Sequence, residues 1–478
     1  MFLAFDLSLT INVLSGFFSI FPACIKFNKL LLLAIQTSFN YFALQRCDTS
    51  MEEDFFSNLP DDILVSILSL LSLKETARTS ILSHRWMNLW KFTSRLDFDN
   101  SQLVMGSSMH WWANPLEVQW SRFGNWVNNV LKKHQGTSID EFTVCFYVNE
   151  NSSKCNIDSW INFALQKRVR KLRLDFTSLK RQFEYGSYIL TTQFLASYNL
   201  NSLVVLHLNG VEVTGKVVEY ILSHCPLLEV LSVTTSKSLV HLKVSSPSLK
   251  LKCLEIRLCS SLKYIEISAT SLMSFKYSGQ KIRILVNNLP HLVEASIEGW
   301  YACFLVENVC HFKRYLSKLQ TLLLDLKLEG FRRFPKIPKL KNLKELELLL
   351  SAHAIKNLIY CDSLLKASPL LHRFILKIFG LRSFNSHKKA NERGVGRIHP
   401  CVKVIELCGF YGCGLDFELV LHLLKRAVSL EKLVIDTCCV DFQGRKFDCR
   451  DLKQKLAVKT RAKQLKTRLP PGAELVIF

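Results

Sequence analysis

Hydrophobic residues recur along most of this chain in one spacing: an apolar residue, a second three positions later, and a third two positions after that. The last two alternate with polar residues, which is the period of a β-strand with one buried face. The pattern therefore predicts a series of short strands facing a common core. The eleven principal matches are Val169/Leu172/Leu174, Leu203/Leu206/Leu208, Leu228/Leu231/Val233, Leu251/Leu254/Ile256, Leu272/Phe275/Tyr277, Leu292/Ala295/Ile297, Leu319/Leu322/Leu324, Leu343/Leu346/Leu348, Leu371/Phe374/Leu376, Val402/Ile405/Leu407 and Leu430/Leu433/Ile435.

The spacing of the matches indicates what lies between the strands. The four matches that begin at 228, 251, 272 and 292 follow one another after 23, 21 and 20 residues, and the other intervals are 24 to 34 residues long. The longer intervals leave room for helices on the outer side. Apolar helical faces occur in two of them, Val217/Val218/Ile221/Leu222 and Phe417/Val420/Leu421/Leu424.

The short intervals have no room for a helix. Each of two short intervals holds one additional match to the strand pattern, midway between the principal strands. We interpret them as extended segments on the opposite side of the coil. They are Leu239/Leu242/Val244 and Leu262/Ile265/Ile267.

Repeats of about 20 to 29 residues with this pattern are typical of leucine-rich repeats, which stack into a solenoid. We therefore expect an α/β fold with a curved parallel sheet and outer helices. The residue before the last apolar position of each motif should point away from the core, onto the concave surface. These candidates for substrate binding are Arg173, His207, Ser232, Glu255, Lys276, Ser296, Leu323, Glu347, Ile375 and Glu406.

That predicted surface mixes charges and sizes. It has neither the continuous basic stripe of a nucleic-acid reader nor a convergent catalytic set. No Gly-rich phosphate loop, metal-ligand array or nucleophile motif stands out elsewhere, so we expect no enzymatic activity, no metal and no cofactor. Recognition of a protein or peptide is the simplest use of such a surface.

A different pattern, helical, occupies residues 55–100. Ile63, Leu64, Ile67, Leu68 and Leu71 form one apolar stripe on a predicted helix that begins near Pro60. Ser72-Leu73-Lys74-Glu75 has the pattern of a capping box, and a third helical stretch would carry Ile81, Leu82, Trp86, Leu89 and Trp90. Three helices this short cannot bury all of these side chains, so some apolar surface should remain for a partner.

The order of residues in this module resembles the F-box of plant proteins: Leu59-Pro60 at the start, an aliphatic stripe, and Ser83-His84-Arg85-Trp86 at the end. His84 and Met87 depart from the basic residues that this family often has there, which bears on the strength of binding. The resemblance implies docking onto a Skp-type adaptor, and through it a cullin. The residues expected to contact the adaptor are Leu59, Pro60, Ile63, Leu64, Ile67, Leu68 and Trp86.

The C-terminal part resembles the FBD region that closes many plant F-box/leucine-rich-repeat proteins. The resemblance is carried by Lys403-Val404-Ile405-Glu406-Leu407, by 430–436 and by the ending Leu469-Pro470-Pro471-Gly472 onward. The expected domains are a hydrophobic extension (1–50), the F-box (55–100), a Trp-rich connector (101–165), the solenoid (166–400) and FBD-like repeats with a basic tail (401–478).

Residues 1–50 differ in composition from the rest, with uncharged runs from Leu7 to Ile25 and from Leu30 to Gln45. Asn12, Gly16 and Pro22 interrupt the first run, and no basic residue precedes it. Three interpretations stay open: an upstream extension of the reading frame, a membrane anchor with the F-box in the cytosol, and a targeting segment. Without an anchor, we expect a cytoplasmic or nuclear protein.

The formal net charge is +22, and the basic excess is partly concentrated between Arg445 and Arg468. We interpret that stretch as a solvated helix face, since no aromatic residues interleave for base stacking. Sixteen cysteines without a CxxC pair predict mostly buried, reduced thiols.

The resemblance implies a substrate receptor of an SCF-type (Skp, cullin, F-box) ubiquitin ligase, in which the repeats select a protein for ubiquitination. A solenoid interaction protein whose F-box no longer binds the adaptor is the alternative. A nucleic-acid-binding protein is a third reading.

Overall fold

The computed structural model describes residues 59–81, 83–99, 116–146, 154–176, 187–245, 249–307, 313–326, 339–351, 359–380, 399–412, 414–441, 444–447 and 450–478. The chain divides into two compact units, 1–60 and 61–478, and every described helix and strand lies in the second. The expected extension 1–50 lies outside the described residues. No helix within the described ranges is both long enough and apolar enough to cross a membrane.

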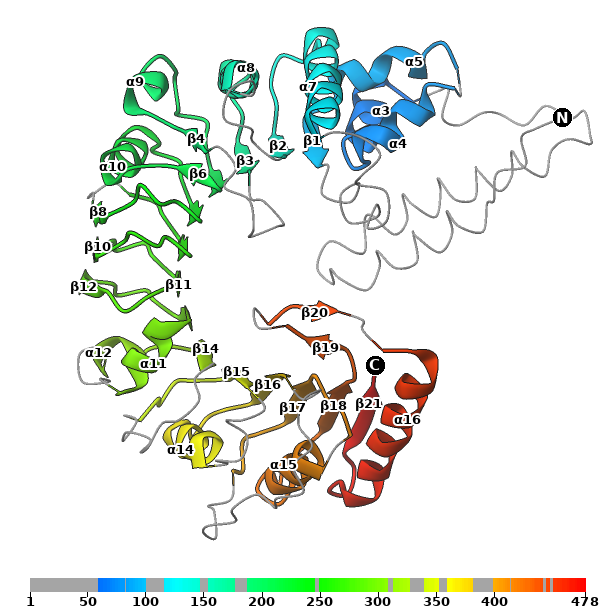
Figure 1. The fold of residues 1–478 in the computed structure, drawn as a ribbon, viewed down its shortest axis with the longest axis vertical. Helices are drawn as coiled ribbons and strands as arrows, with labels where there is room; N and C mark the ends of the chain where they lie inside the picture. The colour runs from blue at the N-terminus through cyan, green and yellow to red at the C-terminus, as the bar shows by residue number, and fades with distance from the viewer. Residues whose placement is uncertain are drawn as a thin grey trace, which may run out of the picture. The chain divides into compact units, whose positions relative to one another are not determined.

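Short helices begin the second unit (Figure 1): α3 (Asp61–Leu68), α4 (Leu73–Thr79), α5 (Trp86–Leu89) and the 3-10 helix η1 (Trp90–Phe92). The capping box is confirmed: the Ser72 hydroxyl accepts a hydrogen bond from the Glu75 N–H, and the Glu75 carboxylate accepts one from the Ser72 N–H. The third helix is shorter than predicted and leaves Ile81 86% exposed. Ser83 and His84 are exposed and contribute no apolar side chain that could hold a longer helix face.

One large parallel sheet follows, and in the described part of the chain it holds fourteen strands. In spatial order they are β1 (Arg95–Asp99), β2 (Glu141–Cys145), β3 (Lys171–Asp175), β5 (Val205–Asn209), β7 (Val230–Thr234), β9 (Cys253–Arg257), β11 (Ser274–Ser278), β13 (Glu294–Glu298), β14 (Thr321–Leu326), β15 (Glu345–Ser351), β16 (Arg373–Phe379), β17 (Val404–Cys408), β18 (Lys432–Asp436) and β21 (Glu474–Ile477). All eleven principal sequence matches lie at such strands, so the predicted leucine-rich-repeat solenoid is confirmed.

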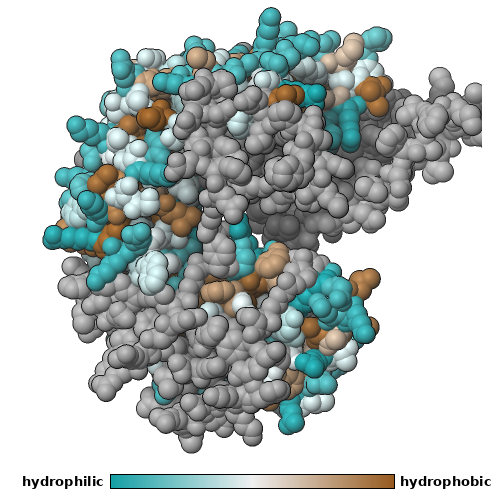
Figure 2. Space-filling model, viewed as in Figure 1, coloured by the Kyte–Doolittle hydropathy of each residue, from teal (hydrophilic) through white to brown (hydrophobic). Residues whose placement is uncertain are grey.

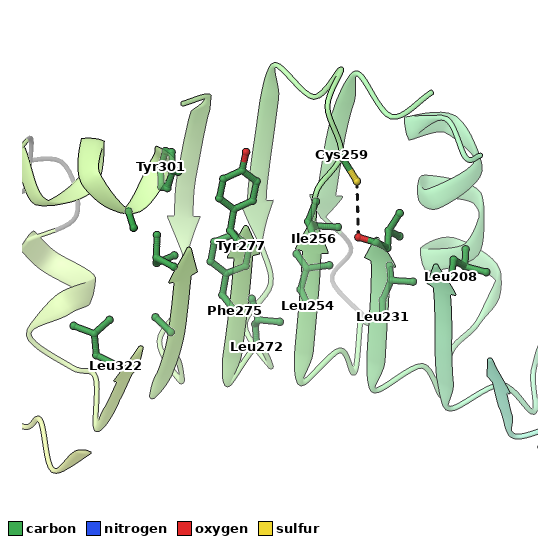
Figure 3. Close-up of a cluster of buried hydrophobic side chains, with 14 of the residues drawn as sticks. Leu208, Leu231, Leu254, Ile256, Cys259, Leu272, Phe275, Tyr277, Tyr301 and Leu322 are labelled. Atoms are coloured by element: carbon green, nitrogen blue, oxygen red, sulfur yellow. Dashed lines mark hydrogen bonds between the residues drawn. The ribbon is translucent and has the colours of Figure 1, made fainter. Parts of the chain in front are cut away.

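The second and fourth residues of each strand form the core. Leu206, Leu231, Leu254 and Phe275 are partners in register across β5 to β11, and each is at most 3% exposed. Figure 3 shows Leu231, Leu254 and Phe275 following one another from strand to strand. Burying one such leucine contributes about 1.5–3 kcal/mol. Because each strand contacts only its neighbours, the core is one continuous ladder rather than a central cluster.

Helices cover one side of this sheet in Figure 1. They are α7 (Leu116–Lys133), α8 (Lys154–Gln166), α9 (Thr192–Leu195), α10 (Gly215–His224), α11 (Trp300–Glu307), α12 (Lys313–Leu316), α14 (Ile359–Ala367), α15 (Gly414–Leu424), α16 (Leu452–Lys463) and the 3-10 helix η4 (Gln464–Arg468). The predicted apolar face of α10 is confirmed, with Val217, Val218, Ile221 and Leu222 all buried.

Where the repeats are shortest, strands replace the helices. β8 (His241–Ser245), β10 (Tyr264–Ser268) and β12 (Arg283–Asn288) form a separate parallel sheet. The two additional sequence matches correspond to β8 and β10 and are confirmed, whereas β12 was missed. Its run Ile284-Leu285-Val286 does not alternate with polar residues, so the strand pattern skips it. The remaining pairs are parallel β4 (Tyr188–Ile189) with β6 (Val211–Glu212), and antiparallel β19 (Cys439–Val440) with β20 (Lys446–Phe447).

The sheet also extends beyond the eleven matches, through β1, β2 and β21. The stretch 101–165, interpreted from sequence as a connector, contributes α7, β2 and most of α8, and β2 pairs along its full length with β1 and β3. Ile139-x-x-Phe142-x-Val144 fits the strand pattern and could have revealed β2. Trp160 from this stretch is buried in the core, and Trp126 is 42% exposed.

Candidate interaction surfaces

Helix α3 has a buried and an exposed face, and the residues predicted to contact an adaptor are divided between them. Leu64, Ile67 and Leu68 are at most 5% exposed, so they pack inside the helical module 61–92. A side chain this buried cannot contact a partner while the module stays folded. The predicted residues that remain accessible are Leu59, Pro60, Ile63 and Trp86.

The same module exposes large apolar side chains outside the predicted set. We call these, together with Ile63, the module surface: Ile63 (47% exposed), Leu70 (55%), Ile81 (86%), Met87 (45%) and Phe92 (43%). Five large exposed apolar side chains within residues 63–92 favour a protein-binding surface. Met87, which departs from the family pattern, adds apolar area there instead of charge.

An ion pair joins the first and third helices of the module. Arg85 Nε donates a hydrogen bond to Asp61 Oδ1 at 2.7 Å, which ties the start of α3 to the turn before α5. Both side chains are partly exposed, so the pair contributes little to stability, about 0–1 kcal/mol. It links α3, which carries Ile63, to the residue directly before α5, which carries Met87.

The module is joined to the sheet through backbone hydrogen bonds. The Lys91 carbonyl accepts from the Gln135 and Gly136 N–H groups at 2.8 and 3.2 Å, and the Ser94 carbonyl accepts from the Asp140 N–H at 2.8 Å. His134 lies in this join, with Nε2 3.0 Å from the Thr93 carbonyl oxygen, and burial lowers the pKa of its imidazole. The hydrogen bond to that carbonyl opposes the shift, but burial, assisted by the charge of Lys167, outweighs it, so the uncharged ring is favoured.

The ten predicted recognition residues stand at the third position of their strands, on the side of the large sheet opposite the buried second and fourth residues. They are aligned in register on successive strands, from Arg173 on β3 to Glu406 on β17. We call the side of the sheet that these third-position residues share the open face. The order across it is Arg173, His207, Ser232, Glu255, Lys276, Ser296, Leu323, Glu347, Ile375 and Glu406.

These ten residues differ in accessibility. Arg173 is exposed, whereas Ser232, Ser296 and Ile375 are at most 6% exposed, and the other six are half-buried. Burial and the neighbouring Arg173 lower the pKa of His207. The prediction that they bind a substrate is therefore strongest at the β3–β5 end of the open face.

Charges in the middle of the open face bind each other. Arg257 contacts Glu298 at 2.5 Å and Glu255 at 3.5 Å, and the Ser232 hydroxyl donates to Glu255 at 3.0 Å. One strand further along, Lys276 contacts Glu294 at 3.2 Å. These contacts satisfy most of the charges locally, so a partner would have to exchange existing ion pairs for new ones.

The far end of the open face is covered by the chain's own hairpin, β19–β20. Val440 of β19 is buried in a small cluster with Leu349 and Cys408, and Phe379 packs against it. The hairpin turn lies so close to β15 that a Cβ on Gly444 would be 3.2 Å from Leu349 Cδ2. Gly444 also has φ +77°, which favours glycine.

Lys446 of β20 anchors the hairpin electrostatically. Its Nζ lies 2.6 Å from Asp436 Oδ2 and 3.8 Å from Glu406 Oε1. Burial opposes ionisation of Asp436, but the hydrogen bonds from Lys446 and from the Cys438 N–H outweigh it and lower the pKa of the carboxyl. Burial raises the pKa of the Cys408 thiol beneath the hairpin to about 12, so this thiol is unreactive while covered.

Sequence reasoning missed this hairpin. Its two strands are only two residues long each, and no apolar alternation marks them. An available signal was Cys439-Val440 and Lys446 on either side of Gly444, directly after a predicted strand. The reduced-thiol prediction also needs a correction here, since Cys439 is disulfide-bonded, while eight other described cysteines are free.

Comparisons with known proteins match both regions. The family model "At1g61320/AtMIF1, LRR domain" matches residues 130–467, and the "F-box domain" model matches residues 56–96. In Arabidopsis thaliana, F-box/LRR-repeat protein At2g42730 is 31% identical over 266 residues, covering 51% of this chain and 56% of that protein. The aligned region thus spans about half the length of that relative.

Two other Arabidopsis thaliana relatives are covered more fully. F-box/LRR-repeat protein At3g58900 is 30% identical over 266 residues, or 51% of this chain and 79% of that protein. F-box/FBD/LRR-repeat protein At5g53840 is 24% identical over 424 residues, or 80% of this chain and 88% of that protein. The chain belongs to the leucine-rich-repeat family At1g61320/AtMIF1 and, with the F-box domain before its repeats, is an F-box/leucine-rich-repeat protein.

Proposed function

We propose that this protein is the substrate-receptor subunit of an SCF-type ubiquitin ligase and has no catalytic chemistry of its own. The F-box domain binds a Skp-type adaptor, and the leucine-rich repeats hold a protein substrate for ubiquitination. The observation that carries the proposal is the module surface, where apolar side chains stand in solvent on a domain that matches the F-box model.

The accessible residues define the adaptor contact. Leu59, Pro60, Ile63 and Trp86 are the predicted residues that a partner can reach, and Met87 adds to them from α5. Leu64, Ile67 and Leu68 act indirectly, by packing the helix that presents Ile63. This division separates residues whose loss should weaken binding from residues whose loss should unfold the module.

The open face supports the second half of the proposal. Its β3–β5 end carries the exposed Arg173 and the half-buried His207, and the other end is closed by the hairpin β19–β20. A protein substrate would therefore bind toward the F-box side of the sheet. Ubiquitin transfer by an SCF-type ligase takes place in the cytoplasm or nucleus, which is the location we propose.

Adaptor binding is tested by pull-down of the purified full-length chain with a Skp-type adaptor. The double variant Leu59→Ala/Pro60→Ala and the single variant Ile63→Asp should lose most of the binding, because each removes exposed apolar contact area. Leu370→Asp, at a leucine 48% exposed on the solenoid, is the matched control and should bind normally. Unchanged binding by both F-box variants would contradict the proposal.

The alternative, a solenoid interaction protein with a degenerate F-box, makes the opposite prediction. In that case, the wild-type chain would not retain the adaptor, yet it would still retain other proteins through the open face. Comparison of proteins that co-purify with the wild type and with Arg173→Glu/His207→Glu distinguishes a recognition face from a merely solvated one. The adaptor itself should be retained equally by both.

A further inference from the structure

Helix α16 is attached to the solenoid by a narrow strip of its surface. Val458 and Ala462 are buried, and Leu465 of η4 continues the strip into the core. The Asp451 carboxylate caps the helix by accepting a hydrogen bond from the Gln454 N–H at 2.7 Å. Arg461 donates to the Gly412 carbonyl on the neighbouring loop. The helix is thus held in one orientation, with most of its circumference in solvent.

The solvent side of α16 carries two leucines. Leu452 is 84% exposed and Leu456 is 68% exposed, and a separation of four residues places them one turn apart on the same face. A surface helix normally turns its leucines toward the core. In Figure 2, hydrophobic residues stand among hydrophilic ones on the surface over α16.

The same face is rich in positive charge. From Leu452 to Arg468 the chain has seven Lys and Arg residues and no acidic residue. Lys459 and Lys463 lie four residues apart, a spacing at which like charges repel along a helix. Among the described residues, no acidic side chain pairs with Lys459 or Lys463.

Two unfavourable features on one face, exposed leucines and repelling lysines, would both be relieved by one class of partner. Nucleic acid would neutralise the lysines but leave the leucines in water, and no aromatic residue offers base stacking. A membrane-surface helix needs a wider apolar face than two leucines between lysines. An acidic protein segment with apolar side chains satisfies both features.

We propose that the outward face of α16, formed by Leu452, Leu456, Lys459 and Lys463, docks an acidic amphipathic segment of a partner protein. Carboxylates of that segment pair with the two lysines, and its apolar side chains cover the two leucines. This docking site is separate from the module surface and the open face, and it does not depend on the proposed ligase function.

The test uses the purified full-length chain and a fluorescent synthetic helical peptide of glutamates with leucines one turn apart. Fluorescence anisotropy should show binding that weakens about tenfold in Leu452→Ala/Leu456→Ala and similarly in Lys459→Gln/Lys463→Gln. Leu370→Ala and Lys344→Gln, exposed residues away from α16, should bind the peptide as the wild type does. Circular dichroism checks that each variant is folded.

Three further probes identify the class of partner: poly-glutamate, a single-stranded oligonucleotide and vesicles of anionic lipid. Binding of the peptide well above that of poly-glutamate, and sensitive to both leucines and lysines, is the expected result. The proposal would be overturned if the leucine variants bind the peptide normally, since the face would then be only a charged surface. Tighter binding of the oligonucleotide or the vesicles would overturn it as well.

Discussion

The module surface and the open face differ in what they leave unsatisfied. The module surface exposes apolar side chains that nothing in the described chain covers, whereas the open face carries charges that mostly pair with one another. Almost any partner of complementary shape can bury exposed apolar side chains. An existing ion pair is broken only by a partner that supplies a replacement charge. The comparison suggests a constant partner at the first surface and a selected one at the second.

The largest expected difference lies within α3. Substitution of two neighbouring residues there should lower the free energy of unfolding by very different amounts. Leu64→Ala removes a fully buried side chain and should lower the free energy of unfolding by about 2–5 kcal/mol. Ile63→Ala should lower it by less than about 0.5 kcal/mol, because the side chain is half in water. Urea denaturation of both variants measures the difference. Equal destabilisation would mean that Ile63 is part of the core rather than of the module surface.

On the open face, substitution of a charge should cost stability even though no partner is present. Arg257→Met leaves Glu298, 9% exposed, without its 2.5 Å contact. We expect the free energy of unfolding to fall by about 1–3 kcal/mol. Arg173→Met, at the exposed end of the same face, is the control and should change it little. If Arg257→Met is as stable as the wild type, the charges are not mutually satisfied.

The next prediction concerns the hairpin β19–β20, which covers the far end of the open face. Lys446→Met removes the contact to Asp436 and should raise the fraction of molecules with a lifted hairpin about 5- to 30-fold. The rate at which N-ethylmaleimide labels Cys408, measured by peptide mass spectrometry, reports this opening. Cys225, buried in the core elsewhere, should be labelled at an unchanged rate. A Cys408 rate equal to that of the wild type would show that Lys446 does not hold the hairpin.

The smallest expected effect concerns His134, which lies where the helical module is joined to the large sheet. His134 has a pKa below its ordinary value of 6.5 because of burial, so the unfolded chain binds its proton more readily than the folded chain does. Its contribution to stability is therefore present above about pH 6.5 and is lost as the pH falls through the lower folded-state pKa. Urea denaturation at about pH 7.5 and about pH 5.5 should show a steeper loss for the wild type than for His134→Gln. Parallel losses would exclude His134 as the cause.

The solenoid was largely predictable because each repeat buries its apolar residues against its neighbours. The strands around Leu231 and Leu254 can be recognised from a few residues of local sequence. The pairing register between them then follows from the repetition of the pattern. The position of the hairpin β19–β20 was not predictable in this way, since Gly444 meets Leu349 nearly one hundred residues away in sequence.

The helical module shows the same limit on a smaller scale. The apolar stripe of α3 was read correctly as helical, yet sequence alone could not tell which of its residues face inward. Leu64 and Ile63 are adjacent and chemically alike, and only packing against the rest of the module separates the buried one from the exposed one. Site residues depend on such choices more than the fold does.

Because β1 follows directly from the helical module, the position of a strand in the large sheet sets its distance from that module. Parallel strands are about 4.8 Å apart, so each strand farther from β1 moves a bound substrate by that distance along the sheet. On the proposed function, a substrate bound at β5 and one bound at β13 would place their lysines about 19 Å apart along the sheet. The number of repeats between the F-box and the contact point would then select which lysine is modified.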